Sequence, residues 1–376
     1  MAIFSNLRVL ELASVLAGPS VGQFFAELGA EVIKVENSKT GGDVTRTWKG
    51  ASETTDDRSA YFCSVNWGKK SLAVDLTSAE GKLAVQRLAA KSDIIIASYK
   101  PGDAEKLGVS FEQLRINNTK LIYGQITGYG SDTDRVGYDA VIQAEAGFMD
   151  LNGDKQGEPL KMPVALIDIL AAHHLKEALL LAILNGERTG QGSFVEVSLI
   201  QTAISSLANQ ASNWLVGKKL PTRQGSLHPN IAPYGESFLT ADGKRILLAV
   251  GSDRQFQELC DLLGIADERY RTLFSSNQKR VENRSELGTV LSNQIQKMQS
   301  VDLLKQINQR KIPAGIIQNL REVFEMKEAD SLIIEGNGLR GVKTFASVLS
   351  FESQGSTLLP PPHFGEHTQE VLNSIS

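Results

Sequence analysis

Leu7-Arg-Val-Leu-Glu-Leu12 is typical of a β-strand, and Glu31-Val-Ile-Lys-Val-Glu36 is typical of a second one. Between them, Gln23 to Leu28 has apolar residues at helical spacing and ends at Gly29, a common helix stop. These segments predict a β-α-β unit. The loop that joins the first strand to the helix, Ala13 to Gly22, would present backbone N–H groups at a helix start, where they suit a phosphate or a carboxylate.

This loop lacks the fingerprint of a nicotinamide-binding domain. Gly18, Pro19 and Gly22 do not form G-x-G-x-x-G, and Pro19 has no N–H to offer to a pyrophosphate. The P-loop and H-E-x-x-H patterns are also absent from the sequence, which disfavours kinase-like enzymes and zinc proteases.

Strand and helix patterns continue to alternate through about residue 200. Further strands are expected at 71–75, 93–97, 121–126 and 193–198, and helices at 80–90, 169–184 and 200–216. This alternation predicts an α/β fold, a doubly wound, Rossmann-like parallel sheet whose ligand sites lie outside the carboxyl ends of the strands. The long polar loop that runs to about Asp57 is expected at such an end.

A breaker-rich segment at Leu220-Pro221 marks the expected end of this first domain. After it, Ala241-Asp-Gly-Lys244 lies between two strand patterns and indicates a β-hairpin, and several helical patterns follow. We therefore expect a large domain of residues 1–220, to which residues 332–376 return, and a smaller α+β domain of residues 221–331. A short helical pattern after a proline stop is expected to dock on the large domain.

The composition is that of a globular protein and narrows the range of partners. The 376 residues carry a net charge of −4 from interspersed charges, so nucleic acid is not an expected partner. Cys63 and Cys260 are the only cysteines, which excludes a disulfide framework and a thiolate zinc site and fits a reducing compartment. The longest apolar run is far too short for a membrane span. We expect a cytoplasmic protein that binds neither nucleic acid nor membrane.

One acidic residue stands at the start of the longest apolar helical pattern. Asp168 precedes Ile169 to Leu184, where it would act as an N-cap or as a preorganised carboxylate whose charged form the helix dipole favours. His173 and His174 are adjacent, point in different directions on a helix and form no metal-binding pair. Basic residues at the expected ligand edge are candidates for phosphate binding: Lys39, Arg46, Lys100 and Lys106.

Eight short motifs stand in order along nearly the whole chain. They are Leu16-Ala-Gly-Pro19, Leu28-Gly-Ala-Glu-Val-Ile-Lys-Val-Glu36, Gly42-Asp-Val-Thr-Arg-Thr-Trp48, Lys100-Pro-Gly102, Gly137-Tyr-Asp139, Asp168, Arg188-Thr-Gly-Gln-Gly192 and Phe364-Gly-Glu-His-Thr368. Each motif alone is weak, but together and in this order they resemble the class III CoA-transferase family, which also includes α-methylacyl-CoA racemases.

The resemblance implies a CoA-transferase that uses an acyl-CoA and a small carboxylic acid, with coenzyme A as co-substrate and without a metal. Asp168 matches the family's catalytic aspartate, which would form an aspartyl anhydride and then an aspartyl-CoA thioester. Backbone N–H groups around Ser226 to Asn230 would stabilise the oxyanions. Candidate substrate contacts are Trp48, His228 and Asn230. The family's CoA positions fall on Val15, Leu16, Ala17, Val74, Asp75, Leu76, Thr77, Ser98, Tyr99, Lys100, Lys106, Val136, Gly137, Tyr138 and Asp139.

Three features depart from the family's pattern. Asn37 stands where some relatives have a CoA-contacting Arg, so that contact would pass to Lys39 or be lost. Lys106 stands where relatives often have Arg, and it offers a phosphate a point charge in place of a fork. The linker lacks the glycine-run loop of the oxalate-using enzymes, which disfavours oxalate as a substrate.

The resemblance further implies a homodimer of two chains interlocked as rings, each with its tail packed back on the large domain. Two other functions remain open. An α-methylacyl-CoA racemase needs two opposed bases, and racemase relatives carry His where this chain has Tyr138, a poor base near neutral pH. A non-catalytic CoA-binding protein would keep the fold without turnover.

Overall fold

The structure, a computed structural model, describes residues 2–350 and 358–375, which fall into two units. The large unit comprises Met1–Phe148, Lys161–Lys219 and Asp330–Ser376, and the small unit comprises Met149–Leu160 and Leu220–Ala329. The large unit therefore joins the first part of the chain to its C-terminal segment.

Residues 149–160 belong to the small unit, whereas the sequence predicted them in the large domain. Gly225 donates its N–H to the Gly153 carbonyl at 3.1 Å. Arg223 contacts the Asp150 carbonyl oxygen at 3.0 Å and the Asp150 carboxylate at 3.2 Å. These partners are far apart in sequence, so no local pattern could indicate the boundary.

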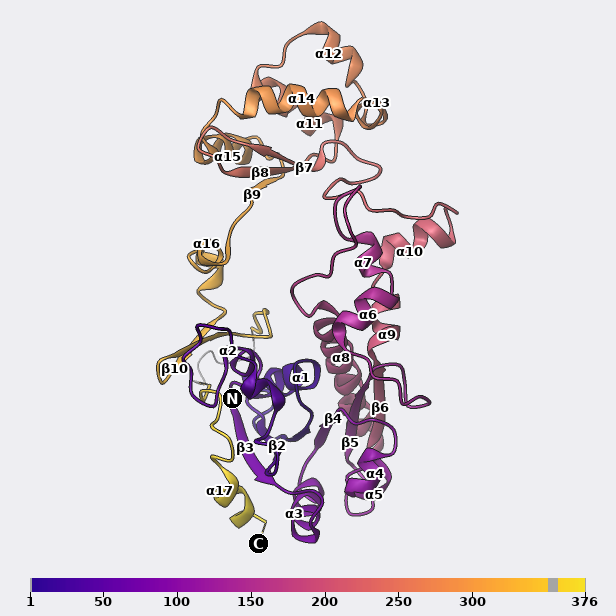
Figure 1. The fold of residues 1–376 in the computed structure, drawn as a ribbon, viewed down its shortest axis with the longest axis vertical. Coiled ribbons are helices and arrows are strands. Elements are labelled where there is room, and N and C mark those ends of the chain that lie inside the picture. The colour runs from indigo at the N-terminus through magenta and orange to yellow at the C-terminus, as the bar shows by residue number, and fades with distance from the viewer. Residues whose placement is uncertain (1, 351–357, 376) are drawn as a thin grey trace. The chain divides into compact units, whose positions relative to one another are not determined.

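Six parallel strands form the sheet of the large unit, in the order β3-β2-β1-β4-β5-β6 (Figure 1). They are β1 (Arg8–Leu12), β2 (Glu31–Asn37), β3 (Lys69–Val74), β4 (Ile94–Ala97), β5 (Ile122–Thr127) and β6 (Ser193–Ser198). The strand order reverses between β1 and β4, and this switch point is where ligands bind in doubly wound folds. The predicted α/β fold with a parallel sheet is confirmed.

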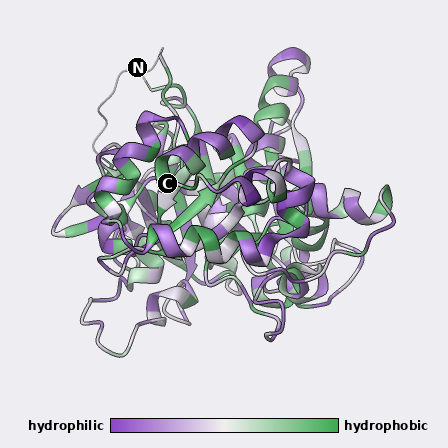
Figure 2. Ribbon diagram, turned by 90° about the horizontal axis from the view of Figure 1, so that it is seen from above, coloured by the Kyte–Doolittle hydropathy of each residue, from purple (hydrophilic) through white to green (hydrophobic). Residues whose placement is uncertain are grey.

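Helices cover both faces of this sheet because successive residues of its apolar strands point to opposite sides. Val9 lies in one core, with α1 (Ala17–Glu27), α8 (Leu166–Thr189) and α9 (Leu199–Ser205). Leu10 lies in the opposite core, with α3 (Ala79–Ala90), α4 (Asp103–Leu107), α5 (Phe111–Leu114) and α17 (Thr368–Asn373). Figure 2 shows helices that carry both hydrophilic and hydrophobic stretches. Shorter elements of the loops are η1 (Val44–Thr47), α2 (Ala60–Cys63), α6 (Asp139–Glu145), α7 (Phe148–Leu151) and α10 (Ala208–Leu215).

The helix predicted over residues 200–216 is two helices in the structure. α9 ends at Ser205, whose hydroxyl donates to the Thr202 carbonyl at 2.9 Å and so competes with the helical hydrogen bonds of the backbone. α10 begins at Ala208, which has a left-handed φ of 46°. Among the described residues, no helix combines the length and hydropathy that a bilayer crossing requires.

The small unit is built on a three-stranded antiparallel sheet of β7 (Tyr234–Leu239), β8 (Arg245–Ala249) and β9 (Ala314–Ile316). The predicted hairpin around Ala241 to Lys244 joins β7 to β8. The apolar core of the small unit includes Phe238, Leu259 and Leu291. The helices are α11 (Asp253–Leu263), α12 (Glu268–Leu273), α13 (Asn277–Glu282), α14 (Arg284–Ile295), α15 (Ser300–Gln309), α16 (Leu320–Phe324) and η2 (Lys327–Ala329).

The C-terminal segment packs on the large unit at two places. After the hairpin of β10 (Ile333–Gly336) and β11 (Leu339–Val342), Glu27 accepts the N–H groups of Thr344 and Phe345 at 2.7 and 3.0 Å. Further along, the Thr368 hydroxyl accepts the Ala73 N–H at 3.0 Å. These contacts hold α17 beside the edge strand β3.

Candidate active site

A cavity of about 210 Å³ lies at the carboxyl ends of β1 to β4, beside the switch point of the sheet. Five of the residues at predicted CoA positions line it: Asp75, Leu76, Thr77, Ser98 and Tyr99. Charged residues for which the sequence predicted no contact also line it: Lys34, Glu36 and Asp43. The cavity therefore has polar and ionic groups at one sheet edge, where a phosphate-bearing ligand could bind.

A second cavity, of about 340 Å³, shares Tyr99 with the first and includes the predicted contact Lys100. Phe111 and Phe194 provide apolar walls. Burial raises the pKa of Tyr99 to about 12, so its hydroxyl stays protonated at neutral pH and can donate a hydrogen bond. The second cavity extends from the carboxyl end of β4 to Phe194, near the start of β6.

Lys39 lies beside two other residues at predicted CoA positions. Its ammonium group is 2.7 Å from the Asp75 carboxylate and 3.0 Å from the Thr77 hydroxyl. Hydrogen bonds, first from Lys39 and then from Thr77, lower the pKa of Asp75 to about 2. The backbone N–H of Lys39 also donates to the Asn37 side chain at 2.9 Å. Lys39 is therefore bonded to the residue at which the sequence departs from the family's pattern.

The remaining residues predicted at this edge differ in what they can offer. Lys106 lies in α4, where its ammonium group is 3.1 Å from the Asp103 carboxylate. Because both side chains are exposed, this pair is weak, and Lys106 can turn toward a phosphate. Lys100 is exposed in the turn after β4. Val74 is buried in the core at the end of β3, which leaves only its backbone for a ligand.

Val15 has a left-handed backbone conformation with a φ of 72°. Such a φ is a genuine outlier for a β-branched residue. Both carboxylate oxygens of Asp43 lie 3.3 Å from the Val15 nitrogen, and Asp43 pairs with Lys34 at 2.8 Å. The predicted contacts Leu16 and Ala17 follow directly, at the start of α1.

Gly18-Pro-Ser-Val-Gly22 has the G-x-S-x-G spacing of a nucleophile elbow. A nucleophile elbow exposes its serine at a sharp turn between a strand and a helix. Ser20 instead lies inside α1 and is buried. The motif is therefore not a serine nucleophile site.

Asp168 lies in the first turn of α8 and is only 9% exposed. Burial, and secondly the charge of Asp139, raise the pKa of Asp168 to about 7. The N-cap residue is Ala165, and among the described residues none donates a hydrogen bond to the Asp168 carboxylate. The expected N-cap role is therefore wrong, and burial outweighs the expected effect of the helix dipole on ionisation.

Asp139 caps α8 in place of Asp168. Its carboxylate accepts the Ile167 N–H at 2.8 Å. The Gln143 amide donates to the same carboxylate at 2.6 Å and accepts the Met162 N–H at 2.9 Å. Asp139, predicted as a CoA contact, thus connects α6 to the start of the helix that carries Asp168.

The other predicted residues next to Asp139 lie on the surface or in a tight backbone contact. Val136 and Tyr138 are exposed. Gly137 packs against Gly128, because a Cβ atom at Gly137 would lie 2.7 Å from the Gly128 Cα. Glycine is therefore required at residue 137 by packing, independently of any ligand.

Trp48, a candidate substrate contact, packs edge-on against Tyr61 with ring centroids 5.1 Å apart. Burial, followed by the charges of Asp168, Asp139 and Asp43, raises the pKa of Tyr61. The aromatic pair therefore lies within electrostatic reach of Asp168. The sequence did not single out Tyr61, and it marked Asp43 only as part of the motif Gly42 to Trp48.

His228 and Asn230 lie in the small unit, in the turn before β7. The His228 ring contacts Tyr234 edge-on, with centroids 5.2 Å apart, and its Nδ1 accepts the Asn230 N–H at 3.2 Å. Leu227 and His228 also donate their N–H groups within the small unit, so of the expected oxyanion donors only Ser226 has no partner among the described residues. Substrate contacts of His228 and Asn230 remain predictions.

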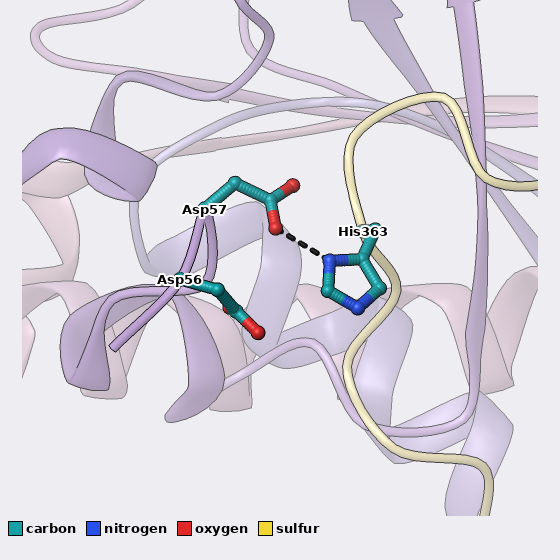
Figure 3. Close-up of side chains that lie close together, drawn as sticks. All are labelled: Asp56, Asp57 and His363. Atoms are coloured by element: carbon teal, nitrogen blue, oxygen red, sulfur yellow. Dashed lines mark hydrogen bonds and ion pairs between the residues drawn. The ribbon is translucent and has the colours of Figure 1, made fainter. Parts of the chain in front are cut away.

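Asp56, Asp57 and His363 form the one group of potential metal ligands found among the described residues (Figure 3). Their ligand atoms lie within 4.8 Å of one another. Each carboxylate already faces an arginine, Arg58 at 2.5 Å from Asp56 and Arg46 at 3.5 Å from Asp57. The His363 Nδ1 is 2.5 Å from Asp57, so the cluster joins the C-terminal segment to the loop before α2.

The chain is similar to known proteins over nearly its whole length. Residues 4–368 match CoA-transferase family III. Succinate–glutarate CoA-transferase of Agrobacterium fabrum is 38% identical, over 99% of this chain and 95% of its own length. Succinyl-CoA:glutarate CoA-transferase of Mus musculus is 34% identical, over 100% of this chain and 87% of its own length. A CAIB/BAIF family protein from Brucella suis has a TM-score of 0.85 at 36% identity, covering 99% of this chain and 98% of that chain.

Proposed function

The chain belongs to CoA-transferase family III, and from that premise we propose that it moves CoA from an acyl-CoA donor to a carboxylic acid acceptor with Asp168 as the nucleophile. The observation that carries the proposal is the nearly buried Asp168 carboxylate at the start of α8. Because α8 is the crossover helix between β5 and β6, its N-terminus lies at the carboxyl edge of the sheet, where the 210 Å³ cavity also lies.

The proposed reaction has four steps, and each of them makes or breaks an acyl bond to the Asp168 carboxylate. An Asp168 oxygen attacks the donor thioester carbonyl, the C–S bond breaks, and a mixed anhydride and CoA thiolate form. The thiolate attacks the aspartyl carbonyl and releases the donor acid, which leaves an aspartyl-CoA thioester. The acceptor carboxylate then attacks this thioester to give a new anhydride and thiolate. Attack of the thiolate on the acceptor acyl carbonyl yields the new acyl-CoA and restores Asp168.

The surroundings of Asp168 suit this role. A pKa of about 7 leaves a substantial ionised fraction at neutral pH. A carboxylate held away from water has fewer solvent hydrogen bonds to lose when it attacks a carbonyl carbon. Burial therefore serves nucleophilic attack although it raises the pKa.

We propose that CoA binds along the two cavities. The backbone of Val15, Leu16 and Ala17 would meet it at the start of α1, where helix N–H groups suit an anion. Residues 74–77, 98–100 and 136–139 would line its path. Lys39 and Lys106 are the proposed phosphate contacts, since both ammonium groups are exposed at this edge.

We propose dicarboxylic acids as the substrates. The two curated relatives described above are named for succinate and glutarate, which both carry two carboxylates. Incubation with succinyl-CoA and glutarate should therefore give glutaryl-CoA, measured by chromatography. A panel of monocarboxylic and dicarboxylic acceptors, oxalate included, would identify the preferred chain length.

Substitution of Asp168 tests the assignment. Asp168→Asn keeps the shape of the side chain but removes the nucleophilic oxygen pair, so turnover should fall by at least about a thousandfold. Its affinity for free CoA should stay within about threefold of that of the unsubstituted protein. Asp302→Asn, an exposed change on α15, is the matched control and should keep full activity. Equal turnover by Asp168→Asn and the control would contradict the proposal.

We also propose the interlocked homodimer implied by the family resemblance. Large apolar residues with half or more of their surface exposed occur on α8, α9 and α10 and directly after α10, in support of an interface there: Leu181, Leu184, Ile204, Trp214, Leu215 and Val216. Interlocked rings cannot separate by dilution alone. Sedimentation at nanomolar concentration should show only dimer, and a folded monomer that exchanges reversibly would contradict the arrangement.

Neither alternative function gains a specific supporting observation. A racemase needs two opposed bases, and the exposed Tyr138 stands where racemase relatives carry His. Solvent deuterium exchange at the α-carbon of an acyl-CoA, without any acceptor acid, would revive that function. Tight CoA binding without turnover on the whole acceptor panel would favour a non-catalytic protein.

A further inference from the structure

A buried ammonium group, that of Lys34, lies beneath the loop proposed to bind CoA. Lys34 Nζ is 2.9 Å from Glu11, 2.8 Å from Asp43 and 2.8 Å from the Ala13 carbonyl oxygen. The side chains of Lys34, Glu11 and Asp43 are each no more than 1% exposed. Burial lowers the pKa of Lys34, but the neighbouring carboxylates outweigh burial and raise it, so the group stays charged.

This ammonium group fixes the loop after β1 from two sides. Ala13 is held directly through its carbonyl oxygen. Val15 is held through Asp43, whose two oxygens each accept from the Val15 N–H at 3.3 Å. Only Ser14 stands between these two attachment points. Asp43 has little freedom of its own, because it also accepts the N–H and hydroxyl of Thr45 at 3.0 and 2.8 Å.

The conformation held in this way is one that valine does not adopt unaided. At a φ of 72°, the β-branched Val15 would leave the left-handed region unless its surroundings kept it there. Glycine would take this φ without steric cost. A buried carboxylate and its counter-ion are costly to keep in a protein interior, which points to a role beyond packing.

We propose that Asp43 is a positioning residue that holds Val15 in the left-handed conformation, so that the loop from Ser14 to Ala17 is preformed for CoA. Lys34 is the counter-ion that holds Asp43 in place. The inference rests on the proposed function in that CoA is taken to bind at this loop. Asp43 would not touch the reacting atoms, since its oxygens are occupied by Val15, Thr45 and Lys34.

A rescue experiment separates this role from a purely structural one. Affinity for free CoA is measured by titration calorimetry on the full chain. Asp43→Ala removes the partner of the Val15 N–H and should weaken CoA binding about tenfold or more. Adding Val15→Gly to Asp43→Ala should recover about threefold or more of that loss, because glycine reaches the required φ without a partner.

A second variant leaves the buried ion pair intact. Val15→Pro fixes φ near −65° and removes the N–H that Asp43 accepts, so it should also weaken CoA binding about tenfold, with some loss of stability, and affinity is measured well below its thermal midpoint. It tests the proposal even if Asp43→Ala fails to fold. Glu27→Gln is the control, because this carboxylate holds the C-terminal segment rather than the loop. It should lower stability without changing CoA affinity.

The outcomes distinguish the inference from the function on which it rests. Absence of CoA binding by the unsubstituted protein would overturn both. Suppose that the unsubstituted protein and Asp168→Asn both bind CoA. The role of Asp43 alone is then overturned if Val15→Pro binds CoA as tightly as the unsubstituted protein, or if Val15→Gly does not restore binding in Asp43→Ala. The role of Asp43 is supported if CoA binding is weaker in both Asp43→Ala and Val15→Pro. It also requires that Val15→Gly strengthens CoA binding when added to Asp43→Ala but not when made in the otherwise unsubstituted protein.

Discussion

The Asp139 carboxylate accepts the backbone N–H of Ile167 at 2.8 Å. This bond places a negative charge at the start of α8, one residue before Asp168. The charge is the second cause, after burial, that raises the pKa of Asp168 to about 7. The cap of the helix and the ionisation of its carboxylate are therefore linked through one residue.

The first prediction concerns the pH dependence of turnover. Because only ionised Asp168 attacks a thioester, kcat/KM should rise with pH through about 7 and level off above it. Asp139→Asn keeps an acceptor for the Ile167 N–H but removes the charge, so the rise should move to lower pH by roughly half a unit or more. The measurement is the pH profile of kcat/KM for both proteins.

Glu145→Gln is a matched control on the same helix, α6. Its exposed carboxylate pairs with Arg135, so its removal should leave the profile where it is. An identical profile in Asp139→Asn, or a shift to higher pH, would contradict the link between the two carboxylates.

The second prediction concerns stability. The pKa of Asp168 in the folded protein, about 7, lies above its ordinary value of 3.8. Ionisation therefore opposes folding, and stability from this group is present below pH 4 and lost as pH rises through 7. Asp168→Asn should raise the free energy of unfolding at pH 8 by on the order of 1–3 kcal/mol, with much less effect near pH 4.

Urea unfolding at pH 4.5 and pH 8 would measure this difference. If Asp168→Asn is less stable than the unsubstituted protein at pH 8, the prediction is contradicted, because folding would then favour the ionised carboxylate.

The third prediction tests Lys39 as a phosphate contact. Lys39→Ala should raise KM for acyl-CoA by roughly three- to tenfold with little change in kcat, since a contact remote from the reacting carbon adds equally to ground-state and transition-state binding. The effect should shrink at high salt. Lys120→Ala removes an exposed lysine from the opposite end of the sheet, before β5, and should leave KM unchanged. Equal KM values in the two variants would remove Lys39 from the site.

The fourth prediction concerns the anchor of the C-terminal segment. Asp57 accepts the Phe364 N–H at 2.7 Å and pairs with His363. Asp56, in the part of the chain that the structure describes, accepts hydrogen bonds only from Arg58, two residues away in sequence. Asp57→Ala should therefore lower the free energy of unfolding by about 1–2 kcal/mol, and Asp56→Ala by about half a kcal/mol or less. Thermal unfolding and limited proteolysis of the tail measure both. A larger loss in Asp56→Ala would refute the anchor.

The strands of the large unit could be predicted because burial on both faces demands continuous apolar runs such as Ile94 to Ala97. The hairpin of β10 and β11 was missed, although Asn337-Gly338 is a strong turn signal and both residues have a positive φ. Its strands are short and half exposed, which gives little periodicity to detect.

The site was predictable only where a local pattern or a family motif marks it. Asp168 stands out at the start of an apolar helix, but its cap, Asp139, lies far away in sequence. Asp43 lies within the motif Gly42 to Trp48, but its role is marked only indirectly, by the charged residues Glu11 and Lys34 inside β1 and β2. A buried charge in a strand requires a partner, but the sequence does not say which loop supplies it.

The most direct test of the central claim is to trap the intermediate on Asp168. The tryptic peptide of residues 162–176 contains Asp168 as its only carboxylate side chain. When the protein is incubated with succinyl-CoA and hydroxylamine, mass spectrometry of this peptide should show a hydroxamate at Asp168, formed from the aspartyl anhydride or the aspartyl-CoA thioester. Sustained turnover with this peptide unmodified, while controls confirm that hydroxylamine reaches the site, would contradict covalent catalysis by Asp168.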